Sequence, residues 1–167
     1  EAAKGRQAMI LVSPSQVMRY VLKDLKPHLA EDCLLVSAAK GIENDSLLTM
    51  SEVLQEVLGE EIAQRCAFLS GPSFAREVAE EQPTAVAVAA ESLDVVNRVQ
   101  DLFSTEYFRV YTNQDVVGVE IGGAMKNVIA LAAGVSDCLG FNHHARAALI
   151  TRGLAEIARL GEAKGAL

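Results

Sequence analysis

The sequence lacks the residue spacing that would build a disulfide framework or a zinc site. It has three cysteines among 167 residues, and no Cys-x-x-Cys pair occurs. This spacing is typical of reduced, mostly buried thiols in a cytoplasmic protein. His143 and His144 are adjacent and cannot share one helix face, so we expect no metal site.

An excess of positive charge is also missing. Lysine and arginine number 15 against 22 aspartates and glutamates, which gives a net charge of −7. A protein that binds nucleic acid unaided needs a basic face to neutralise phosphates, so we predict no nucleic-acid partner. The first residues are polar, and no signal peptide is visible.

No hydrophobic run long enough to cross a membrane is free of polar or charged residues. The longest apolar stretch, residues 116–135, is long enough to cross a bilayer. Glu120, Lys126 and Asn127 interrupt it, and such side chains are costly in hydrocarbon. We therefore expect a buried helix of a soluble protein and no integral membrane segment.

What the sequence does contain is an alternation of apolar strands and helices. Strands are predicted over residues 9–12, 34–37, 66–69, 84–90 and 107–111, and helices over 15–26, 46–59, 74–81 and 94–103. This order is typical of an α/β sheet, and uninterrupted apolar strands favour a sheet covered on both faces.

The pattern changes at residue 113. Asp115 can cap a long helix that runs to about Ser136, and a second helix is predicted over residues 144–163. No convincing strand follows residue 113. The change predicts a domain boundary near this position, with residues 1–113 on one side and 114–167 on the other.

The long helix contains the first candidate for chemistry. Gly122 and Gly123 each cost about 1 kcal/mol against alanine inside a helix, so they need a packing or functional reason. Lys126 lies among apolar residues, and Glu120 lies six residues earlier on a different face. A buried lysine needs a partner or a lowered pKa, which suits a general acid/base. The alternative is a lysine whose head reaches water.

Two further candidates lie where strands give way to loops. Lys40 and Gly41 follow the second strand, and a lysine there can hold a phosphate or a carbonyl oxygen. Residues 70–75, Ser-Gly-Pro-Ser-Phe-Ala, form a strand-to-helix turn whose free N–H groups attract phosphate or cofactor oxygens. The alternatives are an exposed loop lysine and a plain turn. No G-x-G-x-x-G or G-x-S-x-G motif occurs.

Four stretches together resemble one family, the bacterial NAD(P)-dependent glycerol-3-phosphate dehydrogenases. They are SAAKGIE at residues 37–43, SGPSFARE at 70–77, the helix with GGAMKNV within 111–134, and ARAALITRGLAEIARLG at 145–161. The resemblance implies part of a Rossmann-like doubly wound sheet followed by the start of an all-helical domain. Residues 1–113 would be the later portion of the dinucleotide-binding domain, and residues 114–167 the beginning of the helical substrate domain.

The resemblance also implies roles for single residues. The lysine in GGAMKN matches the family's proton donor and acceptor, and the lysine in AAKGIE contacts both substrate and cofactor. The resemblance thus predicts Lys126 as catalytic, Lys40, Gly71, Ser73 and Asn127 as substrate-binding, and Lys40 and Ala75 as cofactor-binding.

The implied reaction interconverts sn-glycerol 3-phosphate and dihydroxyacetone phosphate with NAD or NADP, and it feeds glycerophospholipid synthesis. The choice between the two cofactors stays open, as does the oligomeric state, with a homodimer among the candidates. Cys138 and His144 depart from the family pattern, which has glycine and asparagine there.

The family's cofactor-binding glycine loop and its phosphate-binding residues are expected outside this sequence. A catalytically incomplete fragment or a regulatory module is therefore the alternative function. Related 3-hydroxyacid and 6-phosphogluconate dehydrogenases also place a lysine and an asparagine on a comparable helix, but the amino-acid sequence of residues 70–75 fits them poorly.

Overall fold

The computed structural model describes residues 3–167, and its strands and helices alternate as far as the fifth strand. The strands are β1 (Ala8–Leu11), β2 (Leu34–Ser37), β3 (Cys66–Ser70), β4 (Thr84–Ala89) and β5 (Phe108–Asn113). The helices are α1 (Ser15–Leu25), the 3-10 turn η1 (Lys26–His28), α2 (Met50–Leu58), α3 (Glu60–Ala63), α4 (Ala75–Ala79), α5 (Leu93–Phe103), α6 (Val116–Cys138) and α7 (His143–Ala163).

The five strands form one sheet in the order β1-β2-β3-β4-β5. The pairs β1–β2, β2–β3 and β4–β5 are parallel, whereas β3 and β4 are antiparallel. The connection between β3 and β4 contains only the short helix α4 and reverses the chain instead of crossing back over the sheet. Because β2 and β3 are parallel neighbours, their carboxyl ends lie at the same edge of the sheet.

Neighbouring side chains of the strands enter two separate cores on opposite faces of the sheet. Leu35 of β2 and Phe68 of β3 pack with residues of α1 and α2. Val36 and Leu69 point the other way and pack with residues of α5. The sheet is thus covered on both faces, which confirms the prediction made from the apolar strands.

One predicted helix begins later than expected. The apolar spacing predicted a helix from residue 46, but α2 begins at Met50. Asp45 and Leu47 have φ angles of 64° and 56°, which no helix accommodates. Thr49 then starts α2 through a capping box with Glu52.

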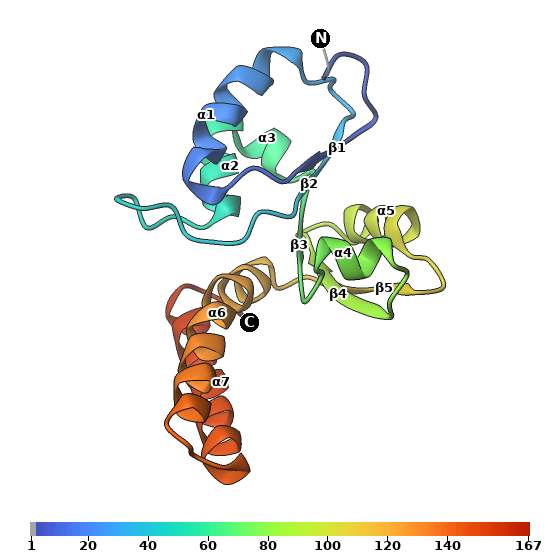
Figure 1. The fold of residues 1–167 in the computed structure, drawn as a ribbon. Helices are drawn as coiled ribbons and strands as arrows, with labels where there is room; N and C mark the ends of the chain where they lie inside the picture. Colours follow the sequence, from blue (N-terminus) through green and yellow to red (C-terminus); the bar gives the residue numbers. More distant parts are fainter. Residues whose placement is uncertain (1–2) are drawn as a thin grey trace.

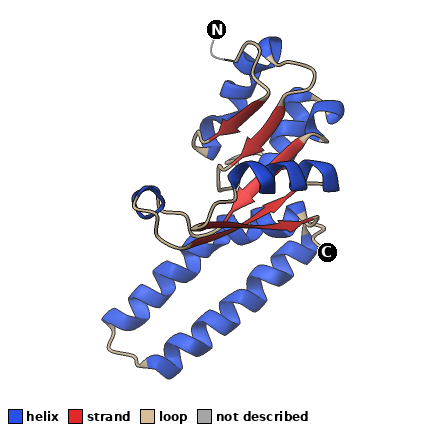
Figure 2. Ribbon diagram, turned by 90° about the vertical axis from the view of Figure 1, so that its right-hand side faces the viewer, coloured by secondary structure: helices blue, strands red, loops and turns tan. Residues whose placement is uncertain are grey.

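The last two helices form an antiparallel hairpin that projects from the sheet (Figures 1 and 2). Asp115 caps α6 as predicted, since its Oδ1 accepts a hydrogen bond from the Gly118 N–H at 2.8 Å. Gly153 of α7 lets the two helices approach closely, because a Cβ there would collide with Ile129 of α6.

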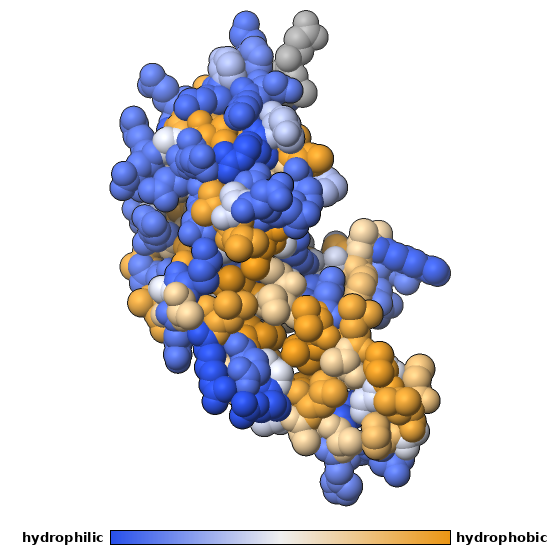
Figure 3. All heavy atoms as spheres, turned by 90° about the vertical axis from the view of Figure 1, so that its left-hand side faces the viewer, coloured by the Kyte–Doolittle hydropathy of each residue, from blue (hydrophilic) through white to orange (hydrophobic). Residues whose placement is uncertain are grey.

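The expectation that α6 is a buried helix is wrong for this structure. Its buried residues are Ile121, Gly123 and Ser136. One stripe packs on the sheet and on α7, whereas the opposite stripe leaves apolar side chains exposed, and apolar atoms gather there in Figure 3. By length and composition alone α6 could cross a membrane, a test that core helices of soluble proteins also pass.

Candidate active site

The sheet edge brings the two loop stretches predicted from the sequence into contact. Lys40 follows β2, and its Nζ donates a hydrogen bond of 2.7 Å to the carbonyl oxygen of Gly71, which follows β3. The contact lies at the carboxyl ends of two parallel strands, where open α/β sheets bind their ligands. Lys40 is partly buried, so it is not a freely exposed loop lysine.

Lys126 of α6 reaches the same edge. It lines a cavity of about 380 Å³ together with Gly71, Gly122 and Gly123. The pKa of Lys40 is lowered from its usual value, first by burial and then by the charge and hydrogen bonding of Lys126. Lys40 also lies against α6, since its Cγ is 3.8 Å from the position of a Cβ on Gly123, and the charge of Lys126 favours the neutral form of Lys40.

Glycines allow α6 to lie this close to the sheet. A Cβ on Gly123 would collide with the Ser70 side chain at the end of β3. Gly71 has a φ of 140°, and a Cβ there would lie 2.9 Å from the Val86 Cα. Gly122 faces the cavity, and a Cβ at this position would meet no described atom within 4 Å. Gly123 thus has a packing reason, and Gly122 borders the cavity.

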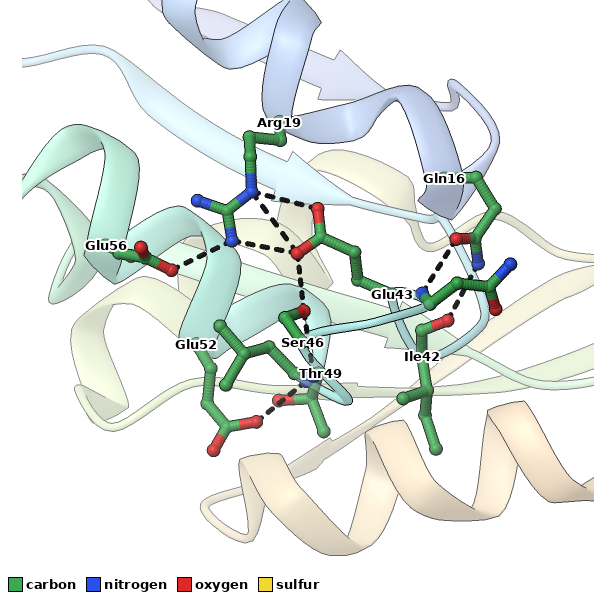
Figure 4. A network of polar contacts seen from close by, with 10 residues as sticks. Gln16, Arg19, Ile42, Glu43, Ser46, Thr49, Glu52 and Glu56 are labelled. Atoms are coloured by element: carbon green, nitrogen blue, oxygen red, sulfur yellow. Dashed lines mark hydrogen bonds and ion pairs between the residues drawn. The ribbon is translucent and has the colours of Figure 1, made fainter.

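A network of polar contacts, absent from our sequence predictions, holds the segment after Lys40 (Figure 4). Arg19 of α1 forms a two-pronged contact with Glu43, with distances of 3.0 Å from Nε to Oε1 and 2.8 Å from Nη2 to Oε2. The same guanidinium reaches Glu56 of α2 at 2.8 Å, and the Ser46 hydroxyl donates to Glu43 at 2.6 Å. We call these four residues the Arg19 clamp.

Hydrogen bonding in the clamp also shifts the pKa of Arg19 and of Glu43. The Arg19 hydrogen bonds, followed by that of Ser46, hold the pKa of the Glu43 carboxyl below its usual value. Hydrogen bonding to Glu43 and Glu56 raises the pKa of Arg19. The only sequence signal for this arrangement is the position of Glu43 within AAKGIE, three residues after Lys40.

The remaining predicted residues do not line the cavity beside Lys126. Ser73 is in the turn after β3 and partly buried, and Ala75 is the exposed first residue of α4. Asn127 is exposed and lines a different cavity along α6, with Leu131 and Val135. Their binding roles stay predictions. Within residues 3–167 no group of three or more histidine, cysteine, aspartate or glutamate side chains could hold a metal ion.

The fold places the chain among proteins in which an α/β sheet is joined to a helical part. Prephenate dehydrogenase from Aquifex aeolicus superposes with a TM-score of 0.55 at 12% identity, over 95% of this chain and 66% of that one. At this identity the likeness shows a shared fold, in which a doubly wound α/β sheet is joined to helices.

Closer comparisons identify the family. The model of the NAD-dependent glycerol-3-phosphate dehydrogenase N-terminus matches residues 1–96, and the model of the C-terminus matches residues 115–167. The chain belongs to the NAD-dependent glycerol-3-phosphate dehydrogenase family.

Individual relatives agree with this assignment. Glycerol-3-phosphate dehydrogenase [NAD(P)+] of Syntrophotalea carbinolica is 64% identical over 98% of this chain and 49% of its own length. That of Geobacter metallireducens is 63% identical over 99% of this chain and 50% of its own. The crystal structure of the Coxiella burnetii enzyme matches with a TM-score of 0.86 at 36% identity, over 96% of this chain and 48% of that one. The chain thus spans about half the length of these relatives.

Proposed function

We propose that the full-length protein containing this chain interconverts sn-glycerol 3-phosphate and dihydroxyacetone phosphate with NAD or NADP. The observation that carries the proposal is the approach of Lys40 to α6, the helix of Lys126, at the carboxyl edge of β2 and β3. Lys126 lines a cavity of about 380 Å³ at the same edge. Family membership supplies the reaction class, and the lysine pair supplies a site suited to it.

The residues at this edge fit an anionic cofactor and an anionic substrate. Lys40 provides a positive charge, Gly122 leaves open space beside the backbone of α6, and Ala75 is exposed at the start of α4. Lys40 and Ala75 would hold the cofactor, and Lys40, Gly71, Ser73 and Asn127 the substrate. NAD(P)(H), when bound, supplies the hydride chemistry.

The lysines divide the remaining work. Lys126 would give a proton to the oxygen on C2 as dihydroxyacetone phosphate is reduced, and it would accept the hydroxyl proton in the reverse direction. Lys40 would hold the oxygen or the phosphate and stabilise negative charge as it develops. The charge of Lys126 helps to lower the pKa of Lys40, so the two side chains affect each other at this edge.

We further propose that residues 1–113 belong to the dinucleotide-binding domain and residues 114–167 to the helical substrate domain. The end of the last described strand at Asn113 and the hairpin that follows support this division. We also propose that the full-length protein is a cytoplasmic homodimer without an integral membrane segment. Its product would feed glycerophospholipid synthesis. The packing of α6 on the sheet and α7, and a net charge of −7, fit a protein in water.

A direct test mixes the purified full-length protein with dihydroxyacetone phosphate and either NADH or NADPH, and follows the absorbance of the reduced cofactor. We expect turnover with at least one cofactor, and product identified as sn-glycerol 3-phosphate. The 167-residue chain alone serves as the matched sample for a catalytically incomplete fragment. A full-length protein that binds both ligands without turnover would contradict the proposal.

A further inference from the structure

Glu120 of α6 faces α2 and makes no pair with Lys126, six residues further along the same helix. Its carboxylate accepts two hydrogen bonds from Ser51, from the backbone N–H at 2.9 Å and from the hydroxyl at 2.5 Å. Ser51 is the second residue of α2, so its N–H has no partner within that helix. A carboxylate at this end also complements the helix dipole.

Helix α2 does not need Glu120 in order to begin. Thr49 and Glu52 already form a complete capping box at its first turn, with the Thr49 N–H donating to Glu52 at 2.7 Å. Burial raises the pKa of the Glu120 carboxyl, while the bonds from Ser51 oppose that rise. The charged side chain is therefore held at a cost, and α2 does not require it in order to begin, because the capping box is complete without it.

The position of the contact suggests what it does instead. Helix α2 is the first helix after the Lys40 loop, and α6 carries Lys126. Glu120 lines one small cavity together with Lys40, Gly41 and Ser70. The contact thus joins the far end of the Lys40 loop to the helix that carries the second lysine, next to the place where the two lysines meet.

We propose that Glu120 is a positioning residue, which docks α6 onto the N-terminus of α2 and so sets the spacing between Lys126 and Lys40. The catalytic part of this proposal rests on the proposed function, because it needs the lysines to be the acting groups. The structural part concerns this chain alone and can be tested without cofactor or substrate.

The test is the titration of the Lys40 amine in the 167-residue chain, followed by NMR of isotope-labelled lysine side chains and assigned with Lys40→Arg. In Glu120→Ala the helix loses its docking contact, Lys126 moves away, and the pKa of Lys40 should rise toward its usual value. A rise in the pKa of Lys40 would point to movement of Lys126, since removal of the negative charge of Glu120 would by itself lower the pKa of a nearby ammonium group.

Two variants on the same contact sharpen the test. Glu120→Gln can still accept from the Ser51 N–H and donate to the Ser51 hydroxyl, so it should not raise the pKa of Lys40. Ser51→Ala loses one of the two bonds and should give a smaller rise than Glu120→Ala. Lys164→Met is the matched control. It breaks a separate contact on α2, from Nζ of Lys164, the residue after α7, to Glu52 at 3.2 Å, and should leave the titration unchanged.

The same variants in the full-length protein connect docking to activity. We expect kcat to fall about 10- to 100-fold in Glu120→Ala, as for a small displacement of an acting group, and Glu120→Gln to restore most of it. An unchanged or lowered Lys40 pKa in folded Glu120→Ala overturns the proposal. If that variant does not fold, an unchanged titration in Ser51→Ala overturns it. Neither result bears on whether the wild-type protein turns over dihydroxyacetone phosphate, which is tested separately.

Discussion

The two lysines of the candidate site are held in place by opposite means. Lys40 lies on a loop, and polar side chains from α1 and α2 tie that loop down through the Arg19 clamp. Lys126 lies on the long helix α6. This helix can approach the sheet because Gly123 has no side chain, and a Cβ there would collide with Ser70.

The difference follows from what each segment lacks. A loop has few regular backbone hydrogen bonds, so side chains must fix its position. A helix forms its own backbone hydrogen bonds, and its position is set by how closely its surface packs against neighbouring elements. A site assembled from both should be sensitive to charge on the loop side and to volume on the helix side.

The largest expected effect separates the two lysines by role. In the full-length protein, Lys126→Ala should lower kcat about 10²- to 10⁴-fold, the usual scale for loss of a general acid/base. Lys40→Ala should act more on KM, because Lys40 holds substrate and cofactor. Steady-state kinetics of both variants measure kcat and KM. A kcat of Lys126→Ala within a few-fold of the wild-type value would contradict the assignment of Lys126 as the acid/base.

Volume on the helix side is tested by two adjacent glycines. Gly123→Val should destabilise the chain by about 1–3 kcal/mol, because the new side chain has no room beside Ser70. Gly122→Ala should stabilise it by up to about 1 kcal/mol, since the Cβ meets open space and alanine favours the helix. Urea unfolding followed by circular dichroism measures both. Equal effects of the two substitutions would contradict close approach at Gly123.

Charge on the loop side is tested by Arg19→Met, which should cost about 1 kcal/mol at neutral pH. The pKa of Glu43 is held below its usual value of 4.5, so the stabilisation is present above that pH and is lost as the pH falls through the lower, folded-state pKa. Unfolding free energies of wild type and variant should therefore converge at acid pH. A difference that stays constant from neutral to acid pH would show that Arg19 acts through packing alone.

Much of the fold could be predicted because it depends on local patterns. Apolar runs indicated the five strands, and Asp115 indicated the start of α6. The start of α2 could not be predicted, since nothing in the apolar spacing reveals that Asp45 and Leu47 adopt positive φ angles. The exposed stripe of α6 was missed because composition reports hydrophobicity and not what covers it.

The candidate site also has a part that could be predicted from the sequence and a part that could not. Lys40, Gly71 and Lys126 stood out through their motifs, and the structure brings all three to one edge. The contacts that hold them were not predictable, because Arg19 and Glu43 are 24 residues apart and Ser51 and Glu120 are 69 apart. Such pairs depend on how helices settle on the sheet, which local sequence does not encode.

The central claim is that one lysine from the loop and one from the helix act on each other at this edge. The most direct measurement is the pKa of Lys40 in the 167-residue chain, with and without Lys126→Met. Burial is the largest cause of the lowering and Lys126 the next, so the variant should raise the pKa of Lys40 while leaving it below its usual value of 10.5. An identical titration in both proteins would contradict the account.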